Sequence, residues 1–267
     1  MRLTRVFVDG ALAPGAIVEL ARDTASHLAK VLRARSGDEI ILFNGDGREF
    51  TGAIEAVRGS RVSASIGAAR SIDRESPLAL TLLQCVPRGD RMDFIVQKAT
   101  ELGVGRIVPV LSQRSVVRLD DAQGASKQAH WRAVAVSACE QCGRNRLPTV
   151  DAPQLLLNYL GAMTPNKTPG LLRLVLEPER AARAARAAHA DIPAAGPVTG
   201  ADIAIGPEGG FAPEELEAFE LSAFSRLGLG PRVLRTETAA IAAIVVLQAR
   251  FGDMSAVSDD SSRTEDA

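Results

Sequence analysis

The sequence predicts an α/β protein in which a mostly parallel sheet with helices on both faces follows a small β-barrel. Two observations carry this prediction. Continuous apolar runs alternate with helical patterns from residue 73 to residue 252, which is typical of strands buried on both faces of a parallel sheet. Short apolar runs rich in Val, Ile and Phe fill residues 1–72 instead, which indicates several short strands. The polar stretch 71–77, which ends in proline, marks the boundary between the two parts.

The N-terminal part is predicted to be mostly strand with one helix. The helix is expected over 24–34, where Ala25, Leu28 and Leu32 recur near helical spacing. The sequence NGDG at 44–47 separates two strands as a hairpin turn. The predicted strands lie at 5–9, 16–21, 38–43, 49–57 and 61–66.

The C-terminal part is predicted to alternate strands and helices to its end. Two stretches fit this pattern poorly: 151–170 reads as a linker, and 179–191 is rich in Ala and Arg. The first helix, 90–103, has apolar positions at Phe94, Ile95, Ala99 and Leu102. The other predicted helices are 126–142, 213–223 and 236–251, and the predicted strands are 78–86, 106–111, 171–176, 201–206 and 225–230.

Composition and charge are those of a soluble globular protein. Hydrophobic residues make up 46% and charged residues 24% of the 267 residues, and the net charge is -1. Residues 253–267 hold five acids and one arginine, so the rest of the chain is slightly basic, and this polar tail is expected to be disordered. The chain has neither an apolar run long enough to span a membrane nor a secretory signal. We therefore expect a cytoplasmic protein that does not interact with membranes.

The three cysteines do not predict a metal site. Cys139 and Cys142 form a CxxC motif, but no second pair follows to complete a four-ligand zinc site. Two small residues on one face of a helix are the simpler interpretation, and a redox or metal centre is the alternative. No metal is expected.

The stretch IAIGPEGGFAPEELEAF, residues 203–219, predicts a glycine-rich loop between a strand and a helix. A phosphate-binding P-loop requires a lysine and a Ser or Thr, and this loop has neither. Glu214, Glu215 and Glu217 already complement the positive end of the following helix, where a phosphate would bind. The exposed backbone suits a flat ligand without phosphate, such as the nucleoside-like S-adenosylmethionine. The alternative is a tight turn with no ligand.

A second glycine-bearing loop occurs in LGLGPRVLRTETAAIAAIVVLQ, residues 227–248. Thr236 is the expected N-cap of the final helix. Both loops follow strands, and parallel sheets bind ligands at the carboxyl ends of their strands. The final helix is apolar almost all round, so it is expected to be buried in the core or in a subunit interface.

Polar residues also gather at the end of the predicted helix 126–142, in ACEQCGRNRLP, residues 138–148. The arginines there either cap the helix C-terminus or contact phosphates and bases of a nucleic acid. Arg114 follows another strand, at the same edge of the predicted sheet. The predicted helix 24–34 and the residues after it carry a basic set, which is either a nucleic-acid surface or a solvated face: His27, Lys30, Arg33 and Arg35.

Four motifs in this order, QKATELGV, ACEQCGRNRLP, IGPEGGF and LGPRVLRTETAAIAAI, resemble the RsmE family of small-subunit ribosomal RNA methyltransferases. This family belongs to the SPOUT superfamily, and the resemblance runs from about residue 2 to about residue 252. It implies a PUA-like RNA-binding barrel over 1–72 and a SPOUT domain with a deep trefoil knot over 73–252. It also implies a homodimer that uses S-adenosylmethionine to methylate N3 of one uridine in 16S ribosomal RNA.

The resemblance assigns site residues as well. Glu177 or Glu208 is expected near the positive sulfur of the cofactor. The cofactor-binding residues are Leu176, Glu177, Gly206, Glu208, Gly209, Gly210, Leu227, Leu229, Gly230, Leu234, Arg235 and Thr236. The RNA-binding residues are Arg5, Lys30, Arg33, Arg114, Arg144, Asn145, Arg146 and Arg232.

Methyl transfer from a sulfonium is a direct displacement, so the enzyme mainly aligns the donor and the acceptor. Uracil N3 must also lose a proton. Arg232 and Arg144 are the predicted stabilisers of the resulting anion, and Glu140 and Glu237 are the predicted bases. The alternatives are a SPOUT enzyme that methylates the ribose 2'-hydroxyl of transfer or ribosomal RNA, and a ribosome assembly factor that binds RNA without catalysis.

Overall fold

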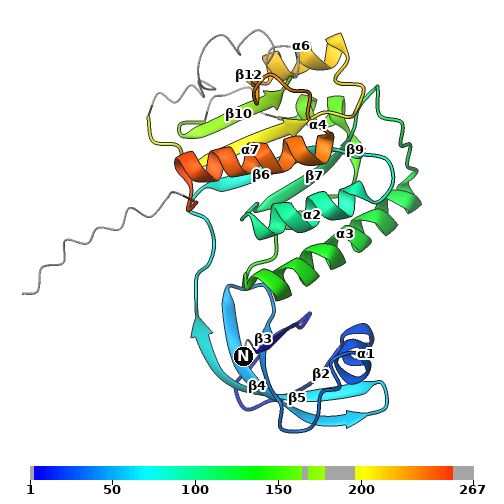
Figure 1. Ribbon diagram of the computed structural model, residues 1–267, viewed down its shortest axis with the longest axis vertical. Helices are drawn as coiled ribbons and strands as arrows, with labels where there is room; N and C mark the ends of the chain where they lie inside the picture. Colours follow the sequence, from blue (N-terminus) through cyan, green and yellow to red (C-terminus); the bar gives the residue numbers. More distant parts are fainter. Residues whose placement is uncertain (1–2, 164–167, 178–195, 255–267) are drawn as a thin grey trace, which may run out of the picture.

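The computed structural model describes residues 3–163, 168–177 and 196–254. Two β-sheets lie one above the other in Figure 1, with helices between them and above the upper sheet. The Ala/Arg-rich stretch 179–191 and the tail from residue 255 lie outside the described residues, so the predictions made for them are untested. Within the described ranges, no helix has the length and apolar character needed to cross a bilayer.

The N-terminal sheet contains five strands in the order β1-β3-β4-β5-β2. Strand β1 pairs with β3 in parallel, and the remaining pairs are antiparallel. The predicted hairpin turn 44–47 joins β3 to β4, with positive φ at Gly45 and Gly47. Leu28 of the helix α1 packs with Leu42 and Phe50 in the core of this part. The elements are β1 (Thr4–Phe7), β2 (Ile17–Glu19), α1 (Arg22–Lys30), β3 (Glu39–Phe43), β4 (Arg48–Arg58) and β5 (Arg61–Ser71).

The C-terminal sheet has the order β12-β10-β11-β6-β7-β8, with β9 also paired to β7. All of its pairs are parallel, as the alternating pattern predicts. Its strands are β6 (Ala79–Cys85), β7 (Arg106–Leu111), β8 (Thr149–Val150), β9 (Gln154–Leu155), β10 (Leu171–Leu176), β11 (Gly200–Ile205) and β12 (Ser225–Leu227). Its helices are α2 (Arg91–Glu101), α3 (Asp121–Cys142), α4 (Leu156–Ala162), α6 (Pro213–Leu221) and α7 (Thr236–Phe251).

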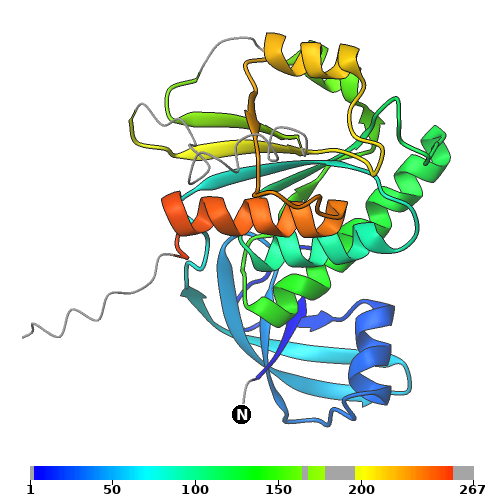
Figure 2. The ribbon, with the colours of Figure 1, turned by 45° about the horizontal axis from the view of Figure 1, so that its top comes forward.

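Helices cover both faces of this sheet. Figure 2 shows α2 and α7 side by side on the face that turns toward the N-terminal sheet. On that face Ile95 of α2, Trp131 of α3 and Ile244 of α7 belong to one apolar core. On the other face Leu160 of α4 and Phe219 of α6 pack in a second core. The deep trefoil knot implied by the resemblance stays a prediction.

Three local predictions need correction. Helix α3 begins at Asp121 rather than at 126, because the Asp120 carboxylate accepts the Gln123 N–H at 2.8 Å and caps the helix. The side chain of Phe94 is 46% exposed, whereas Met92 and Val96 occupy the core positions of α2. The stretch 151–170, predicted as a linker, contains β9 and α4.

Candidate cofactor pocket and nucleic-acid interface

A cavity of about 730 Å³ opens at the carboxyl ends of the central parallel strands. The loops after β10, β11 and β12 and the first turn of α7 form its wall. All predicted cofactor-binding residues except Gly230 line it. The sequence did not identify Ile205, Pro207, Phe211, Pro213, Leu216, Val233 and Ala239, which complete the lining together with Arg114 and Arg232. All seven lie within the stretches 203–219 and 227–248, but as apolar residues next to strands and helices they fit core positions equally well.

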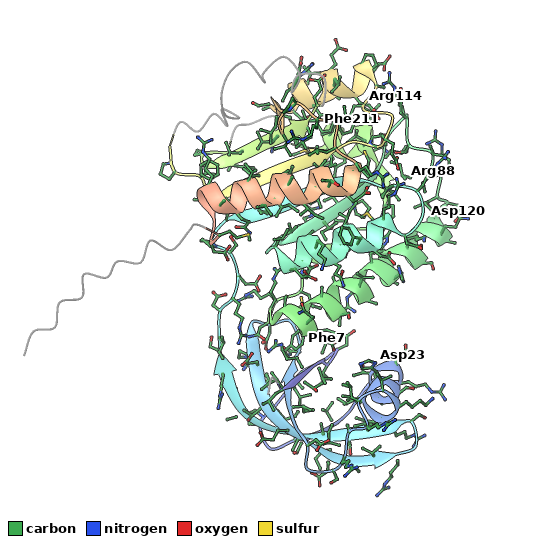
Figure 3. The ribbon with its side chains drawn as sticks, in the orientation of Figure 1. Phe7, Asp23, Arg88, Arg114, Asp120 and Phe211 are labelled. Atoms are coloured by element: carbon green, nitrogen blue, oxygen red, sulfur yellow. The ribbon has the colours of Figure 1, made fainter. Side chains whose placement is uncertain are left out.

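The glycine loop 206–210 is held by contacts from two other segments. Arg114, after β7, donates a hydrogen bond from Nη1 to the Gly209 carbonyl at 3.1 Å. Arg91, at the start of α2, forms an ion pair of 2.6 Å with Glu208. A Cβ at Gly206 would lie 3.2 Å from the Phe211 ring, so a side chain there requires the ring to shift. Figure 3 shows Arg114 and Phe211 at this end of the sheet.

Thr236 does not cap α7. Arg235 holds the N-cap position without a side-chain cap, and Thr236 is the first helical residue. Its hydroxyl donates to the Gly206 carbonyl at 2.9 Å and accepts a hydrogen bond of 2.9 Å from Gln84 Nε2. Thr236 therefore connects the two glycine-bearing loops, and Gln84 supports this connection from β6. Gln84 lies within an apolar run, so no sequence pattern indicated a functional role for it.

The two carboxylates predicted near the cofactor sulfur both have arginine partners. Glu177 lies 2.9 Å from Arg226 Nη1, and Glu208 pairs with Arg91. Arg226 also forms an ion pair with Glu220 at 2.6 Å. Both Glu177 and Glu208 line the pocket, and neither is a lone negative charge.

Arg144 and Asn145 lie at the junction of the two parts of the chain, not at the pocket. Arg144 is 4% exposed, pairs with Glu75 and donates from Nη1 to the carbonyls of Thr100 and Val104 at 2.8 and 2.9 Å. Asn145 donates from Nδ2 to the Ile72 carbonyl at 2.9 Å. All these partners are internal, so the predicted contacts of Arg144 with uracil and of both residues with RNA are replaced by structural ones.

Arg5 completes this junction from the N-terminal sheet. It is 9% exposed and donates to Glu49 at 2.7 Å and to Asn145 Oδ1 at 2.6 Å. Arg74 also pairs with Glu49, at 3.0 Å. We name this set the junction network: Arg5, Glu49, Arg74, Glu75, Arg144 and Asn145. The predicted RNA contact of Arg5 is therefore corrected as well, since its charge is used between the two parts.

Of the two predicted bases, Glu140 and Glu237, neither lines the pocket. Glu140 accepts the Phe7 N–H at 3.0 Å at the junction, where burial raises the pKa of its carboxyl. It does not line the pocket. Glu237 follows Thr236, and its Oε2 is buried without a hydrogen-bond partner among the described residues. Arg146 is exposed and its guanidinium lies against Gly47 of the hairpin turn.

Lys30 and Arg33 are exposed at the end of α1 in the N-terminal part. Arg33 has a φ of 52°, a left-handed conformation that non-glycine residues seldom adopt. Arg114 and Arg232 are exposed at the pocket. The structure thus separates the predicted RNA-binding residues into exposed ones and members of the junction network.

The CxxC motif occupies the last turn of α3. Cys139 is buried and Cys142 is half-buried. Among the described residues, no group of three or more His, Cys, Asp or Glu side chains is placed to hold a metal ion.

The chain is similar to known RNA-modifying proteins over almost its whole length. The RNA methyltransferase domain family matches residues 74–248, and the RNA methyltransferase PUA domain family matches residues 20–66. A ribosomal RNA small subunit methyltransferase E from Buchnera aphidicola (Schizaphis graminum) is 31% identical, with 95% of this chain and 99% of that protein covered.

Two solved structures share the fold. A methyltransferase from Legionella pneumophila in complex with SAM is 38% identical, with a TM-score of 0.84 over 95% of this chain and 100% of that one. A ribosomal RNA small subunit methyltransferase E from Neisseria gonorrhoeae, bound to S-adenosyl methionine, is 35% identical, with a TM-score of 0.79 over the same shares. The parallel sheet, the pocket and these similarities together show that the chain belongs to the ribosomal RNA small subunit methyltransferase E family.

Proposed function

We propose that this protein transfers a methyl group from S-adenosylmethionine to N3 of a uridine in 16S ribosomal RNA of the small subunit. The observation that carries the proposal is the pocket at the carboxyl ends of the parallel strands, whose glycine loop has no phosphate-binding residues. Relatives of this chain act on small-subunit ribosomal RNA by name, and two solved relatives hold the cofactor.

The pocket lining suits this cofactor. Leu176, Leu227, Leu229 and Leu234 offer apolar surface for the adenine, and the glycine loop offers backbone groups. Glu177 and Glu208 add carboxylates to a pocket that would receive a positively charged sulfonium. When bound, S-adenosylmethionine supplies an activated methyl group.

The chain's own residues align the uracil and stabilise its charge. Arg232 is exposed, lines the pocket and has no acidic partner among the described residues. It is our candidate for stabilising the negative charge that develops on the uracil carbonyls when N3 loses its proton. Of the two predicted bases, Glu237 stays the candidate, since Glu140 is bound at the junction.

RNA binding requires an unpaired uridine, because base pairing hides N3. Arg114 and Arg232 at the pocket, together with Lys30, Arg33 and Arg146 in and near the N-terminal part, are the proposed contacts to RNA. The N-terminal part would supply affinity through phosphates, and the pocket would supply the chemistry.

We further propose a cytoplasmic homodimer in which a second copy covers the outer side of α2 and α7. Phe94 of α2 is 46% and Val246 of α7 is 36% exposed, although both helices pack firmly on the sheet. A Val246→Asp variant should then be a monomer in light-scattering measurements. A variant that keeps the mass of the wild type would place the dimer interface elsewhere.

The proposed reaction is tested by incubating the protein with methyl-labelled S-adenosylmethionine and small ribosomal subunits that lack the modification, followed by nucleoside mass spectrometry. Label in 3-methyluridine is expected, with a loss of about 100-fold in kcat for Arg232→Ala and an unchanged affinity for the cofactor. Label in a ribose-methylated nucleoside would favour the 2'-O-methyltransferase alternative. A protein that binds RNA but not the cofactor would favour the assembly-factor alternative.

A further inference from the structure

Two exposed arginines beside the pocket have no role in the proposed function so far. Arg88 lies in the loop between β6 and α2, and Arg118 lies in the loop between β7 and α3. Both loops begin where parallel strands end, at the edge of the sheet that carries the pocket. Figure 3 shows Arg88 between Arg114 and Asp120 along this edge. We name Arg88, Arg114 and Arg118 the rim arginines.

The positive charges of the rim arginines are not neutralised by the contacts of the described residues. Arg114 donates to the Gly209 carbonyl, and Arg118 donates to the carbonyls of Ser115 and Gln113 at 2.9 and 3.4 Å. A neutral carbonyl orients a guanidinium but leaves its charge in place. Arg88 forms no ion pair with a described acidic residue.

Most acidic side chains along the same edge are already engaged. Glu208 forms an ion pair with Arg91, and Asp93 pairs with His130. Glu215 accepts the N–H groups of Gln113 and Ala212. Asp120 caps α3. Asp90, Asp120 and Asp121 are exposed, and hydrogen bonds to neutral N–H groups leave the charges of Asp120 and Glu215 in place. The edge therefore carries mixed charge, and the rim arginines are separate cationic donors on it that form no ion pair with a described carboxylate. Such donors bind individual phosphates.

The loop that presents Arg114 and Arg118 is held in one conformation. Ser112 and Ser115 are buried, and their hydroxyl oxygens lie 3.0 Å apart. The Ser112 N–H donates to the Ser115 hydroxyl and the Gln113 N–H donates to Glu215, at 3.1 and 2.7 Å. A loop fixed in this way loses little conformational entropy when its arginines bind a ligand.

The order of the strands places the rim arginines across the pocket from Arg232 and Arg235. The latter follow β12, at one end of the sheet, whereas Arg114 and Arg118 follow β7. Strands β10, β11 and β6 lie between β12 and β7. Arginines therefore flank the pocket mouth on two sides. A strand of RNA that crosses the mouth would meet positive charge before and after the nucleotide that enters.

We infer, on the basis of the proposed function, that the rim arginines bind phosphates of the RNA strand beside the target uridine. The N–H groups of an arginine guanidinium are placed to bind two phosphate oxygens. Contacts to phosphate do not distinguish between bases. The rim arginines would fix the position of the RNA strand along the pocket mouth, and Arg232 would stabilise the charge on the uracil itself.

The test is the salt dependence of RNA binding by the full-length protein. Binding of small ribosomal subunits and of a uridine-rich single-stranded RNA is measured from 50 to 200 mM salt for the wild type, Arg88→Ala, Arg118→Ala and Arg88→Lys. Each alanine variant should lower the slope of log K against log salt by about 0.7 on the single-stranded RNA, the value for one lost phosphate contact. Arg88→Lys should keep most of the slope, because lysine still carries the charge.

Arg106→Ala is the matched control, because Arg106 lies at the opposite, amino end of β7. It should leave the salt slope unchanged, and all variants should bind S-adenosylmethionine as the wild type does. Wild-type slopes for both Arg88→Ala and Arg118→Ala would overturn the inference. If the alanine variants show a reduced slope but the wild type forms no 3-methyluridine, RNA binding by the rim arginines is supported and the proposed reaction is rejected.

Discussion

The side-chain amide of Gln84 donates a hydrogen bond to the hydroxyl of Thr236 at 2.9 Å. The hydroxyl has one proton, which goes to the Gly206 carbonyl, also at 2.9 Å. This pair of bonds joins the end of β6, the glycine loop and the first turn of α7. Gln84 is fully buried, and its Oε1 has no hydrogen-bond partner among the described residues. An unsatisfied buried acceptor is uncommon in folded proteins. We conclude that the two loops of the pocket are held in place by the protein itself.

Removal of the Thr236 hydroxyl should therefore weaken cofactor binding. Thr236→Val keeps the shape of the side chain but leaves the Gly206 carbonyl without this donor, and Gln84 Nε2 keeps only its hydrogen bond to the Cys85 carbonyl at 2.9 Å. We expect the Kd for S-adenosylmethionine to rise about tenfold, equivalent to about 1.4 kcal/mol, as measured by calorimetry. Thr236→Ser keeps the hydroxyl and should bind nearly as the wild type does. Equal affinities for the Val and Ser variants would show that the hydroxyl does not shape the pocket.

Arg144→Ala should act on stability, because Arg144 belongs to the junction network. The substitution leaves Glu75 and two buried carbonyls without their donor. We expect the free energy of unfolding to fall by about 3 kcal/mol, as measured by urea denaturation. Arg232→Ala, at an exposed site, should change it by less than about 0.5 kcal/mol. An Arg144→Ala protein with wild-type stability and a lost kcat would restore the catalytic role that the sequence suggested.

The sequence predicted the parallel sheet and the pocket because both depend on local patterns. Apolar runs and glycines identify the strand ends, and the carboxyl ends of parallel strands meet at one edge. The junction network could not be predicted, because its partners lie far apart in the chain. Arg5 and Glu49 meet Arg144 and Asn145 only after two sheets have formed. An arginine at a helix end has the same sequence pattern whether it binds RNA or a glutamate of its own chain.

The helical spacing of apolar residues did not predict the buried face of α2 correctly, for a related reason. Phe94 and Met92 both lie on α2, but only Met92 faces the core. Hydrophobicity alone favours the larger side chain. The difference depends on the direction of the helix over the sheet, which is set by packing with α3 and α7 and not by the residues of α2 themselves.

Glu215 should be needed for the shape of the glycine loop and of the loop after β7. It is 1% exposed, and its two oxygens accept the N–H groups of Gln113 and Ala212 at 2.7 and 2.8 Å. Glu215→Ala leaves the buried Ala212 N–H and the Gln113 N–H without their acceptor, and we expect a loss of about 2 kcal/mol in urea denaturation. Glu214→Ala, one position earlier and exposed, is the matched control and should stay within about 0.5 kcal/mol of the wild type. Equal losses for the two variants would contradict the anchoring role.

Cys142 should react with alkylating reagents at lower pH than an ordinary thiol. The Cys139 thiol beside it stabilises the thiolate most, and the Arg144 backbone N–H and guanidinium add to this, so the pKa of Cys142 is lowered. A lowered pKa means that the reactive thiolate persists at neutral pH and is lost only when the pH falls below that pKa. Iodoacetamide labelling followed by mass spectrometry should therefore reach half its maximal rate well below pH 9. Burial raises the pKa of Cys85, so that residue should stay unlabelled and serves as an internal control.

The source of the effect on Cys142 is tested by Cys139→Ala. The Cys139 thiol donates to the Arg146 carbonyl at 3.6 Å, so this oxygen competes with the Cys142 sulfur for the proton. In Cys139→Ala, the pH midpoint of Cys142 labelling should rise. Any amount by which it stays below the midpoint of an ordinary thiol would measure the contribution of Arg144. If the midpoint is the same in Cys139→Ala and the wild type, the thiolate is stabilised by Arg144 alone. A midpoint near pH 9 in the wild type would mean that the Cys142 thiolate gains nothing from either neighbour in the folded protein.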